Sequence, residues 1–481
     1  MFETDLNTCM KPFNTFFIFI CIVCLGACKK DSIIVSPDAS LITSTELVQF
    51  DTVFTTVGSV TQRFTIVNNN DQQLNISSIQ LKGGAQSPFK INVNGNAGVQ
   101  FSNMLMNSND SMYVFVKLTI DPNNQLNPFI VTDSIEIGYN GNIKKVQLQA
   151  YGQNARFING GHISSNTTWN NLLPYVIMKP LTIDTGITLS ISEGTKIFCH
   201  ATAPIIVHGT IKAQGKYYDS TRINFRGDRL DANYKDMPGT WPGIVFTNSS
   251  IANELHYTNI LNAYQAVVAS GGESLIPAKL QLHNCIIDNA YDIGLYAFNS
   301  SITATNCRIT QVGNEGQPGV GGSNIIINGG GKYSFNHCTI ATYANYYQNH
   351  KQAAVYISNA GGASSLPLQF SMDNSIIYGQ GGLAENELVT HKEGNAAFTI
   401  NLRNVLYKVK TDQANISFTN CIKNADPLFD TINTNLRQYN FRLRLGSPCI
   451  DAGITGGPAT DLDGNGRPVG TKADMGCYEK Q

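Results

Sequence analysis

The sequence predicts an all-β protein, with a β-sandwich near its start and a repetitive solenoid after it. Charged residues make up only 14% of the 481 residues, whereas glycine alone occurs 43 times. Short runs in which aliphatic and polar residues alternate recur along the chain, separated by Asn, Gly and Ser, which is the pattern of half-buried strands joined by turns. From about residue 156, one motif with a central bend returns many times, which is typical of a solenoid.

The first element is a short apolar run that ends at Cys28. A membrane-spanning helix needs about 20 apolar residues, so this shorter run has instead the length of a signal-peptide core. The segment Leu-Gly-Ala-Cys28 resembles the lipobox of bacterial lipoproteins, in which the signal peptide is cleaved before the cysteine. The resemblance implies a signal peptide over residues 1–27 and lipidation of Cys28, including palmitate. A generic secretory signal and an internal core segment are the alternatives.

The residues around this segment bear on the start and the location of the protein. Acidic residues before Met10 are unusual in the normally basic start of a signal peptide, which favours Met10 over Met1 as the true start. Lys29 stands where an Asp would signal retention in the inner membrane, so we expect a lipid anchor in the outer membrane. Residues 28–45 carry little pattern and are expected to form a polar tether.

Residues 46–152 are expected to form a β-sandwich of about seven short strands. Asn140-Gly141 separates two alternating runs, and this dipeptide is the strongest short hairpin signal because both residues tolerate positive φ. The segment resembles the immunoglobulin-like modules found near the start of many bacterial surface proteins. The resemblance implies a spacer, with glycan or protein binding as the alternative.

Residues 156–423 repeat the motif apolar, polar, Asn, small or Cys, any residue, Ile, as in LHNCII at 282–287. Asn tolerates the left-handed conformation, so each strand is expected to bend at the Asn. Stacked coils would place the asparagines in a ladder in which each amide bonds to the next, and would stack the cysteines inside. The residues concerned are Asn284, Asn306, Asn374, Asn404 and Asn420, with Cys285, Cys307, Cys338 and Cys421.

These repeats resemble the right-handed parallel β-helix of pectate-lyase-like surface proteins. Residues 424–481 carry the motifs DPLF at 426–429 and LGSPCIDAG at 445–453, which resemble the closing segment that caps the last coil of secreted β-helix proteins. This architecture occurs in surface proteins and in polysaccharide enzymes, so it does not fix the function.

The resemblance implies what catalysis on this fold would use on an outer face. Polysaccharide lyases usually combine acidic calcium ligands with an Arg or Lys base, and pectin hydrolases use several close aspartates. Asp288, Asp292 and Glu315 are the trio to consider, but solvated turn residues are the alternative and no cluster is evident. Two histidines could stack on adjacent coils and hold a metal or act as a base, whereas an exposed polar sheet face is the alternative. One arginine lies in the densest charge cluster, where internal salt bridges are the alternative. These catalytic candidates are Arg226, His256 and His283.

A long excursion between Cys338 and Ser375 is expected to line a binding face, as loops on solenoids often do. Its tyrosines could stack on sugars, whereas packing over the coil edge is the alternative. The candidate ligand-binding residues are Tyr346, Tyr347, His350 and Lys351.

The closing segment offers a candidate cation site and a candidate disulfide. Asp461, Asp463 and Asn465 match the first ligand positions of a calcium loop, but Lys472 stands where a bidentate Glu is wanted, so a capping turn is the alternative. Cys449 and Cys477 could pair in an exported protein.

The formal net charge is −1 and no basic stripe is present, so we expect no nucleic-acid partner. The sequence favours a monomeric, lipid-anchored envelope protein that binds glycan or another surface macromolecule along the β-helix, without catalysis and without a cofactor other than the calcium considered above. The alternative is a polysaccharide lyase or glycoside hydrolase that acts in an outer groove.

Overall fold

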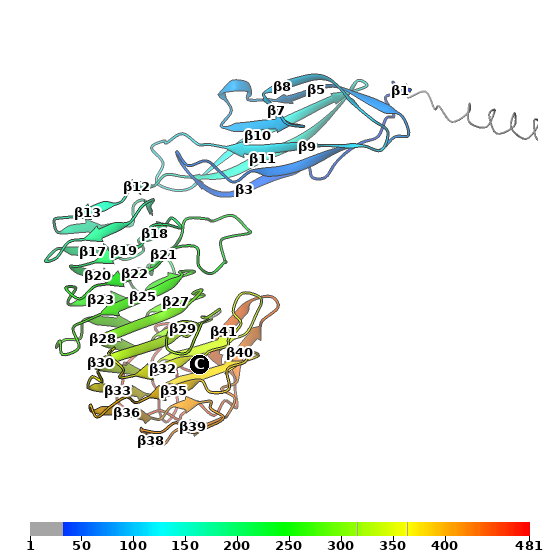
Figure 1. Cartoon of the computed structure of the whole chain (residues 1–481). Coiled ribbons are helices and arrows are strands. Elements are labelled where there is room, and N and C mark those ends of the chain that lie inside the picture. Colours follow the sequence, from blue (N-terminus) through cyan, green and yellow to red (C-terminus); the bar gives the residue numbers. More distant parts are fainter. Residues whose placement is uncertain (1–31, 315, 363) are drawn as a thin grey trace, which may run out of the picture. The chain divides into compact units, whose positions relative to one another are not determined.

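The computed structural model describes residues 32–314, 316–362 and 364–481 (Figure 1). The predicted lipobox and Cys28 therefore lie outside the described residues. The regular structure is almost entirely β, with one 3-10 helix, η1 (Gly84–Gln86), in the described part. No helix among these residues is long and apolar enough to cross a membrane. The chain divides into two compact units, one ending at residue 152 and the other comprising residues 123–128 and 153–481.

The first unit contains two sheets. The β10 sheet comprises β1 (Ile33–Ile34), β3 (Leu47–Phe54), β5 (Gln73–Leu81), β8 (Gln100–Met106), β10 (Phe129–Tyr139) and β11 (Asn142–Gln153). The β9 sheet comprises β2 (Leu41–Thr43), β4 (Gln62–Asn68), β6 (Phe89–Val93), β7 (Asn96–Gly98) and β9 (Ser111–Leu118). Alternate apolar residues of both sheets form one buried core. The predicted hairpin at Asn140-Gly141 is confirmed, because both residues have positive φ and Tyr139 pairs with Asn142.

The second unit is a succession of coils in which strands pair in parallel with the strand one coil later (Figure 1). Its smaller parallel sheet comprises β12 (Arg156–Ile158), β15 (Tyr175–Ile177), β18 (Lys196–Cys199), β21 (Ile223–Gly227), β24 (Thr258–Leu261), β27 (Ile286–Asp288), β29 (Arg308–Thr310), β31 (Thr339–Tyr343), β34 (Ile376–Gln380), β37 (Leu406–Tyr407) and β39 (Ile422–Lys423). The larger parallel sheet consists of two rows of strands, and the long strands β28 and β30 run through both rows.

The first row comprises β13 (Gly161–Ile163), β16 (Leu181–Ile183), β19 (Ile205–Val207), β22 (Ile244–Phe246), β25 (Gln265–Ser270), the first halves of β28 (Ile293–Thr305) and β30 (Ile325–Asn336), β32 (Val355–Ser358) and β35 (Leu388–His391). The second row comprises β14 (Thr167–Trp169), β17 (Thr188–Ser192), β20 (Thr210–Gln214), β23 (Asn253–His256), β26 (Leu280–His283), the second halves of β28 and β30, β33 (Leu368–Asp373), β36 (Phe398–Arg403) and β38 (Ile416–Thr419). Inward aliphatic residues of all three faces form one continuous core.

The predicted bends are confirmed, but the predicted asparagine ladder is wrong. The five bend asparagines have φ between 48° and 56°. Their amides do not bond to one another: Asn284, Asn306 and Asn404 donate to backbone carbonyls of residues 452–461 instead. The cysteines Cys285, Cys307 and Cys338 are buried as predicted, whereas Cys421, in the last coil, is only half-buried.

The C-terminal segment explains where those amides point. After the hairpin β40 (Phe429–Asn433) and β41 (Gln438–Leu443), the chain runs back along the bends, so that Asp461 meets Asn284 and Ala452 meets Asn404. Phe429, Phe441, Met475 and Tyr478 share a second core with the outward residues of β31, β34 and β37. Residues 424–479 therefore cover the outer face of the smaller parallel sheet over its later strands, from β27 to β39. The expectation that this segment caps the last coil is corrected: it covers the side, and Phe418 in that last coil stays 36% exposed.

Candidate functional site

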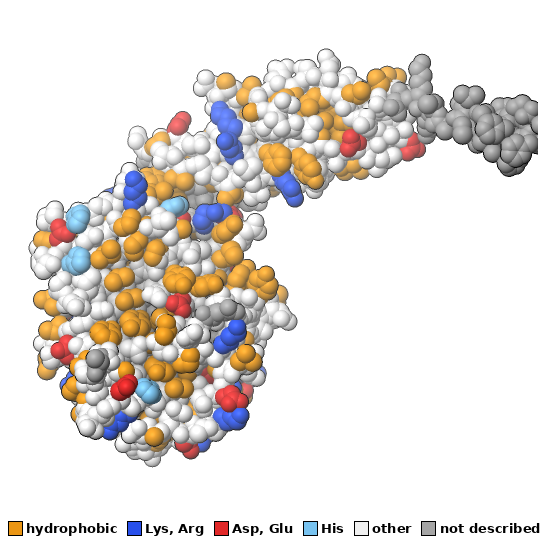
Figure 2. All heavy atoms as spheres, viewed as in Figure 1, with side chains coloured by type: hydrophobic (Ala, Val, Ile, Leu, Met, Phe, Trp, Pro, Cys, Tyr) orange, Lys and Arg blue, Asp and Glu red, His pale blue; other side chains and the backbone are white. Residues whose placement is uncertain are grey.

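The outer face of the first row carries a straight column of apolar side chains. Parallel pairing without a shift aligns one outward residue from each successive strand. The column consists of Val245, Val268, Tyr296, Ile326, Tyr356 and Val389. All except Ile326 are only half-buried, so this column is an apolar surface that faces outward. Figure 2 shows hydrophobic side chains gathering on the surface of this unit, with few charged side chains between them.

Two exposed tyrosines stand beside this column, in the turns that lead into β25 and β28. The rings of Tyr264 and Tyr291 stack with centroids 5.4 Å apart and planes 20° from parallel. They are 47% and 36% exposed, so part of each side chain reaches solvent. Partial burial, and then the neighbouring carboxylate of Asp292, raise the pKa of Tyr264, so its hydroxyl stays protonated at neutral pH. We call these two rings the tyrosine platform.

Polar groups adjoin the tyrosine platform on the same two coils. Gln265 donates from Nε2 to Oδ2 of Asp292 at 2.8 Å, and Oδ1 of Asp292 accepts the backbone N–H of Gly322 at 3.1 Å. A Cβ added at Gly321 would lie 2.2 Å from this Oδ1, so glycine lets the loop approach the carboxylate. The arrangement combines flat aromatic faces with a few fixed hydrogen-bonding groups, as ligand sites commonly do.

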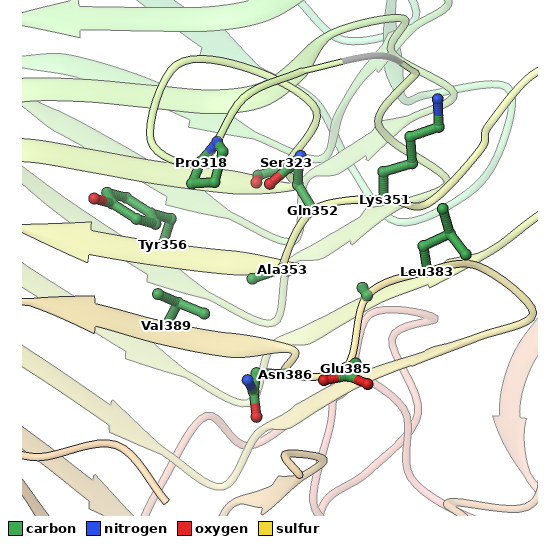
Figure 3. A pocket seen from close by; sticks show the side chains of 11 residues that line it. Pro318, Ser323, Lys351, Gln352, Ala353, Tyr356, Leu383, Glu385, Asn386 and Val389 are labelled. Carbon is green, nitrogen blue, oxygen red and sulfur yellow. The ribbon is translucent and has the colours of Figure 1, made fainter. Parts of the chain in front are cut away.

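A shallow pocket of about 180 Å³ opens further along the same face (Figure 3). Pro318 and Ser323 lie on one side of it, and Glu385 and Asn386 lie on the opposite side. Tyr356 of the apolar column lines it, together with Lys351, Gln352, Leu383 and Val389. The Glu385 carboxylate is paired with Lys410 at 2.7 Å, so the pocket does not present an isolated negative charge.

The catalytic candidates do not form one site. His256 and His283 stack on adjacent coils as predicted, with ring centroids 4.7 Å apart, and burial lowers the pKa of each. They lie on the second row, near the Lys212–Glu254 ion pair, and His256 Nε2 is 3.9 Å from Glu254. Arg226 lies in β21 of the smaller parallel sheet and donates to the carbonyl of Lys235, so the structure does not bring it into a site with the histidines.

The carboxylate trio does not converge either. Asp288 accepts the hydroxyl of Thr310 at 2.6 Å and faces Arg308, whereas Asp292 bonds within the loop described above. Glu315 lies outside the described residues. In the ranges that the structure describes, no three His, Cys, Asp or Glu side chains form a metal-binding group.

The predicted ligand-binding loop is only partly exposed. Tyr346 is 89% exposed and packs edge-on against Tyr347, whose ring lies under Arg437. Lys351 lines the pocket of Figure 3. His350 is corrected: it is buried, and its Nε2 lies 2.9 Å from Oε1 of the equally buried Glu387. It therefore cannot contact a ligand on the surface.

The calcium and disulfide candidates in the C-terminal segment contribute to its internal structure. Asp461 accepts the backbone N–H groups of Asp463, Asn465 and Glu479, and Asp463 pairs with Arg442 at 2.7 Å. The oxygens considered for calcium are thus engaged in a turn. The candidate disulfide is corrected, because Cys449 and Cys477 are both free thiols in the buried core under this segment.

The sequence reasoning missed the tyrosine platform, although a signal was present. The segments Asn-Ala-Tyr264-Gln265 and Asn-Ala-Tyr291-Asp292 repeat the same motif in adjacent coils. Equal spacing from a bend puts equivalent residues of parallel coils next to each other. The motif therefore places one aromatic ring over the next.

No protein-family model matches the sequence, and no curated protein matches it. A family 123 glycoside hydrolase from Clostridium perfringens, described for glycolipid glycan hydrolysis, is 13% identical over 28% of this chain and 25% of that chain, with a TM-score of 0.18. This chain thus spans a quarter of that structure's length. An ASH/PapD-like domain of human CEP192 is 10% identical over 32% of this chain and 99% of that chain, with a TM-score of 0.18.

The catalytic domain of a family 87 α-1,3-glucanase, solved with tetrasaccharides, is 11% identical over 75% of this chain and 87% of that chain, with a TM-score of 0.20. These TM-scores are too low for the similarities to carry an argument about this chain.

Proposed function

We propose that this chain is a glycan-binding protein of the cell envelope, and that the open face of the first row is its binding surface. The main observation that supports this proposal is the tyrosine platform. Its two stacked, exposed rings lie beside hydrogen-bonding groups and an apolar column. Pyranose rings present apolar C–H faces and equatorial hydroxyls, which suit aromatic faces and amide or carboxylate groups respectively.

In this proposal the second unit is a right-handed parallel β-helix over residues 156–423, with a closing segment over 424–481. It is joined to an immunoglobulin-like sandwich that serves as a spacer. The sandwich was predicted over residues 46–152, but it begins earlier, because β1 and β2 of the predicted tether over residues 28–45 pair with β5 and β4. The lipobox supports a signal peptide over residues 1–27 and a lipid anchor at Cys28 in the outer membrane. The protein acts as a monomer, and its weak net charge argues against nucleic acid as a partner.

Non-catalytic binding is the function that the geometry supports best. Glycoside cleavage normally uses two carboxyl groups placed about 5–10 Å apart across the scissile bond. On the open face, Asp292 is tied to Gln265 and to a loop amide, and Glu385 is paired with Lys410. No described residue of this face offers such a pair of unpaired carboxylates.

The experiment is a binding and turnover assay on a panel of neutral and acidic polysaccharides, using residues 29–481, with and without calcium. We expect binding without new reducing ends and without unsaturated products. Replacing Tyr264 and Tyr291 together by Ala should weaken binding about tenfold, because each ring loses its stacking surface. Tyr218→Ala is the matched control, since Tyr218 is also an exposed, paired tyrosine, 61% accessible.

Release of products would overturn the non-catalytic proposal and favour a lyase or hydrolase. Binding that the double variant leaves unchanged would remove the tyrosine platform from the proposal. Absence of binding to every polysaccharide would favour a surface protein as the partner.

A further inference from the structure

The outer face of the β9 sheet in the first unit is basic and aromatic. Its five strands contain no Asp or Glu, whereas they carry Arg63, Lys90 and Lys117, all exposed on the outer face. Asp110 precedes β9, and its carboxylate accepts the backbone N–H of Ser111 at 2.7 Å. The β10 sheet, by contrast, mixes Asp51, Asp133 and Glu136 with its lysines. Of the two sheets of this unit, only the β9 sheet thus carries positive charge on its strands without any acidic residue.

The aromatic residues of this face lie between its cations. Tyr113 and Phe115 stack with ring centroids 6.1 Å apart and planes 30° from parallel. Tyr113 is 45% exposed, and the guanidinium of Arg63 lies 5.3 Å from its ring centroid. Asn92 is the cross-strand partner of Phe115 and adds an amide to the same row. The face therefore offers two adjacent ring surfaces, a planar cation and a hydrogen-bonding amide.

The sheet retains a pairing that lowers its own stability. Lys90 and Lys117 are direct cross-strand partners, and like charges in such positions are destabilising. The Lys90 ammonium bends away to the carbonyls of Ala85 and Ser87 at 3.4 and 3.2 Å. Lys117 extends from the same row as an exposed side chain. An anion placed on this row would lower the repulsion between the two ammonium groups.

We propose that the outer face of the β9 sheet binds an acidic polysaccharide. Sugar rings stack on Tyr113 and Phe115, and the carboxylate or sulfate groups of the polymer pair with Arg63 and Lys117. The charge of the face selects an anionic partner, and the flat rings select a ligand with flat apolar surfaces. This site is separate from the tyrosine platform and does not depend on the function proposed for the second unit.

The test measures binding of the full-length protein to immobilised polygalacturonate and dextran sulfate, with dextran as the neutral polymer. Polygalacturonate probes carboxylate recognition, and dextran sulfate probes sulfate recognition. We expect binding to at least one of the acidic polymers, no binding to dextran through this face, and affinity that falls as salt rises. Tyr113→Ala and Lys117→Gln should each weaken acidic-polymer binding about five- to tenfold.

Lys145→Gln is the matched control, because Lys145 is an exposed lysine on the other sheet of the same unit and loses the same charge. Equal losses in the Lys117 and Lys145 variants would reduce the effect to net charge and overturn the proposal. Absence of binding to both acidic polymers would also overturn it, as would tighter binding of a single-stranded DNA oligonucleotide. The Tyr264/Tyr291 double variant should retain acidic-polymer binding through this face, so failure of one proposal is distinguishable from failure of the other.

Discussion

The later strands of the smaller parallel sheet and the first row of the larger one both present apolar residues outward, but they differ in what covers these residues. Outward residues of the smaller sheet, such as Ile376 and Leu406, are fully buried beneath residues 424–479. Outward residues of the first row, such as Val268 and Tyr356, remain half-exposed. The chain thus supplies a cover for one apolar face and leaves the other open. An uncovered apolar face lowers solubility, so its presence points to a binding partner.

The largest effect is expected from loosening residues 424–479, because this would expose the covered apolar face. Arg467 and Glu479 form an ion pair in which each side chain is 1% exposed, and Arg467 also donates to Oδ1 of Asn306 at 2.6 Å. Arg467→Met leaves the Glu479 carboxylate buried without its partner, so we expect a loss of about 3–5 kcal/mol in the free energy of unfolding. Urea denaturation measures the loss, and increased binding of a hydrophobic dye would report the exposed face.

Arg442→Met is the control for this variant, because the Arg442–Asp463 pair lies on the same segment but is partly exposed. We expect it to cost less than about 1 kcal/mol. Equal effects of the two substitutions would show that the buried pair does not hold the cover in place.

Low pH is expected to destabilise the side of the second unit that residues 424–479 cover. His337 occupies a bend where other coils have Asn, with φ of 51°, and it accepts a hydrogen bond from Asn374 at 3.0 Å. Burial, and then the charge of Arg467, lower the pKa of His337 from 6.5 to about 3. Between these values the unfolded chain binds the proton and the folded chain does not, so stability falls as the pH drops from 6.5 towards 3.

Replacing His337 by Asn removes the titratable imidazole and introduces the residue type found at the neighbouring bends. The variant should gain about 2–4 kcal/mol relative to the parent protein between pH 6.5 and pH 3, and little at pH 8. Buried Asp461 and Asp474 have raised pKa values and contribute with the opposite sign in both proteins. If the free energies of unfolding of the parent and the variant change by the same amount across this pH range, His337 is not the cause of the loss of stability in acid.

The comparison also shows which features the sequence could predict. A bend at Asn284 is a local property, because Asn tolerates positive φ whatever lies around it. The partner of its amide is not local: the carbonyl of Asp461 lies far along the chain, and only the path of the C-terminal segment brings it there. His350 is a second case of a partner that is not local. Its position in a loop suggested that it was exposed, but the folded loop buries it against Glu387.

The smallest predicted effect compares an asparagine whose amide bonds to the C-terminal segment with one whose amide bonds elsewhere. Asn284 and Asn299 both have positive φ, at 56° and 45°, but the Asn284 amide donates to the covering segment whereas that of Asn299 donates to exposed Glu273. Glycine accepts either backbone conformation, so each substitution to Gly removes chiefly a side-chain hydrogen bond. Asn284→Gly should therefore cost about 1 kcal/mol and Asn299→Gly less than about 0.5 kcal/mol. If the two variants unfold at the same urea concentration, the amide bonds to the C-terminal segment add nothing to its attachment, and its hold on the coils rests on the apolar core and the buried ion pair alone.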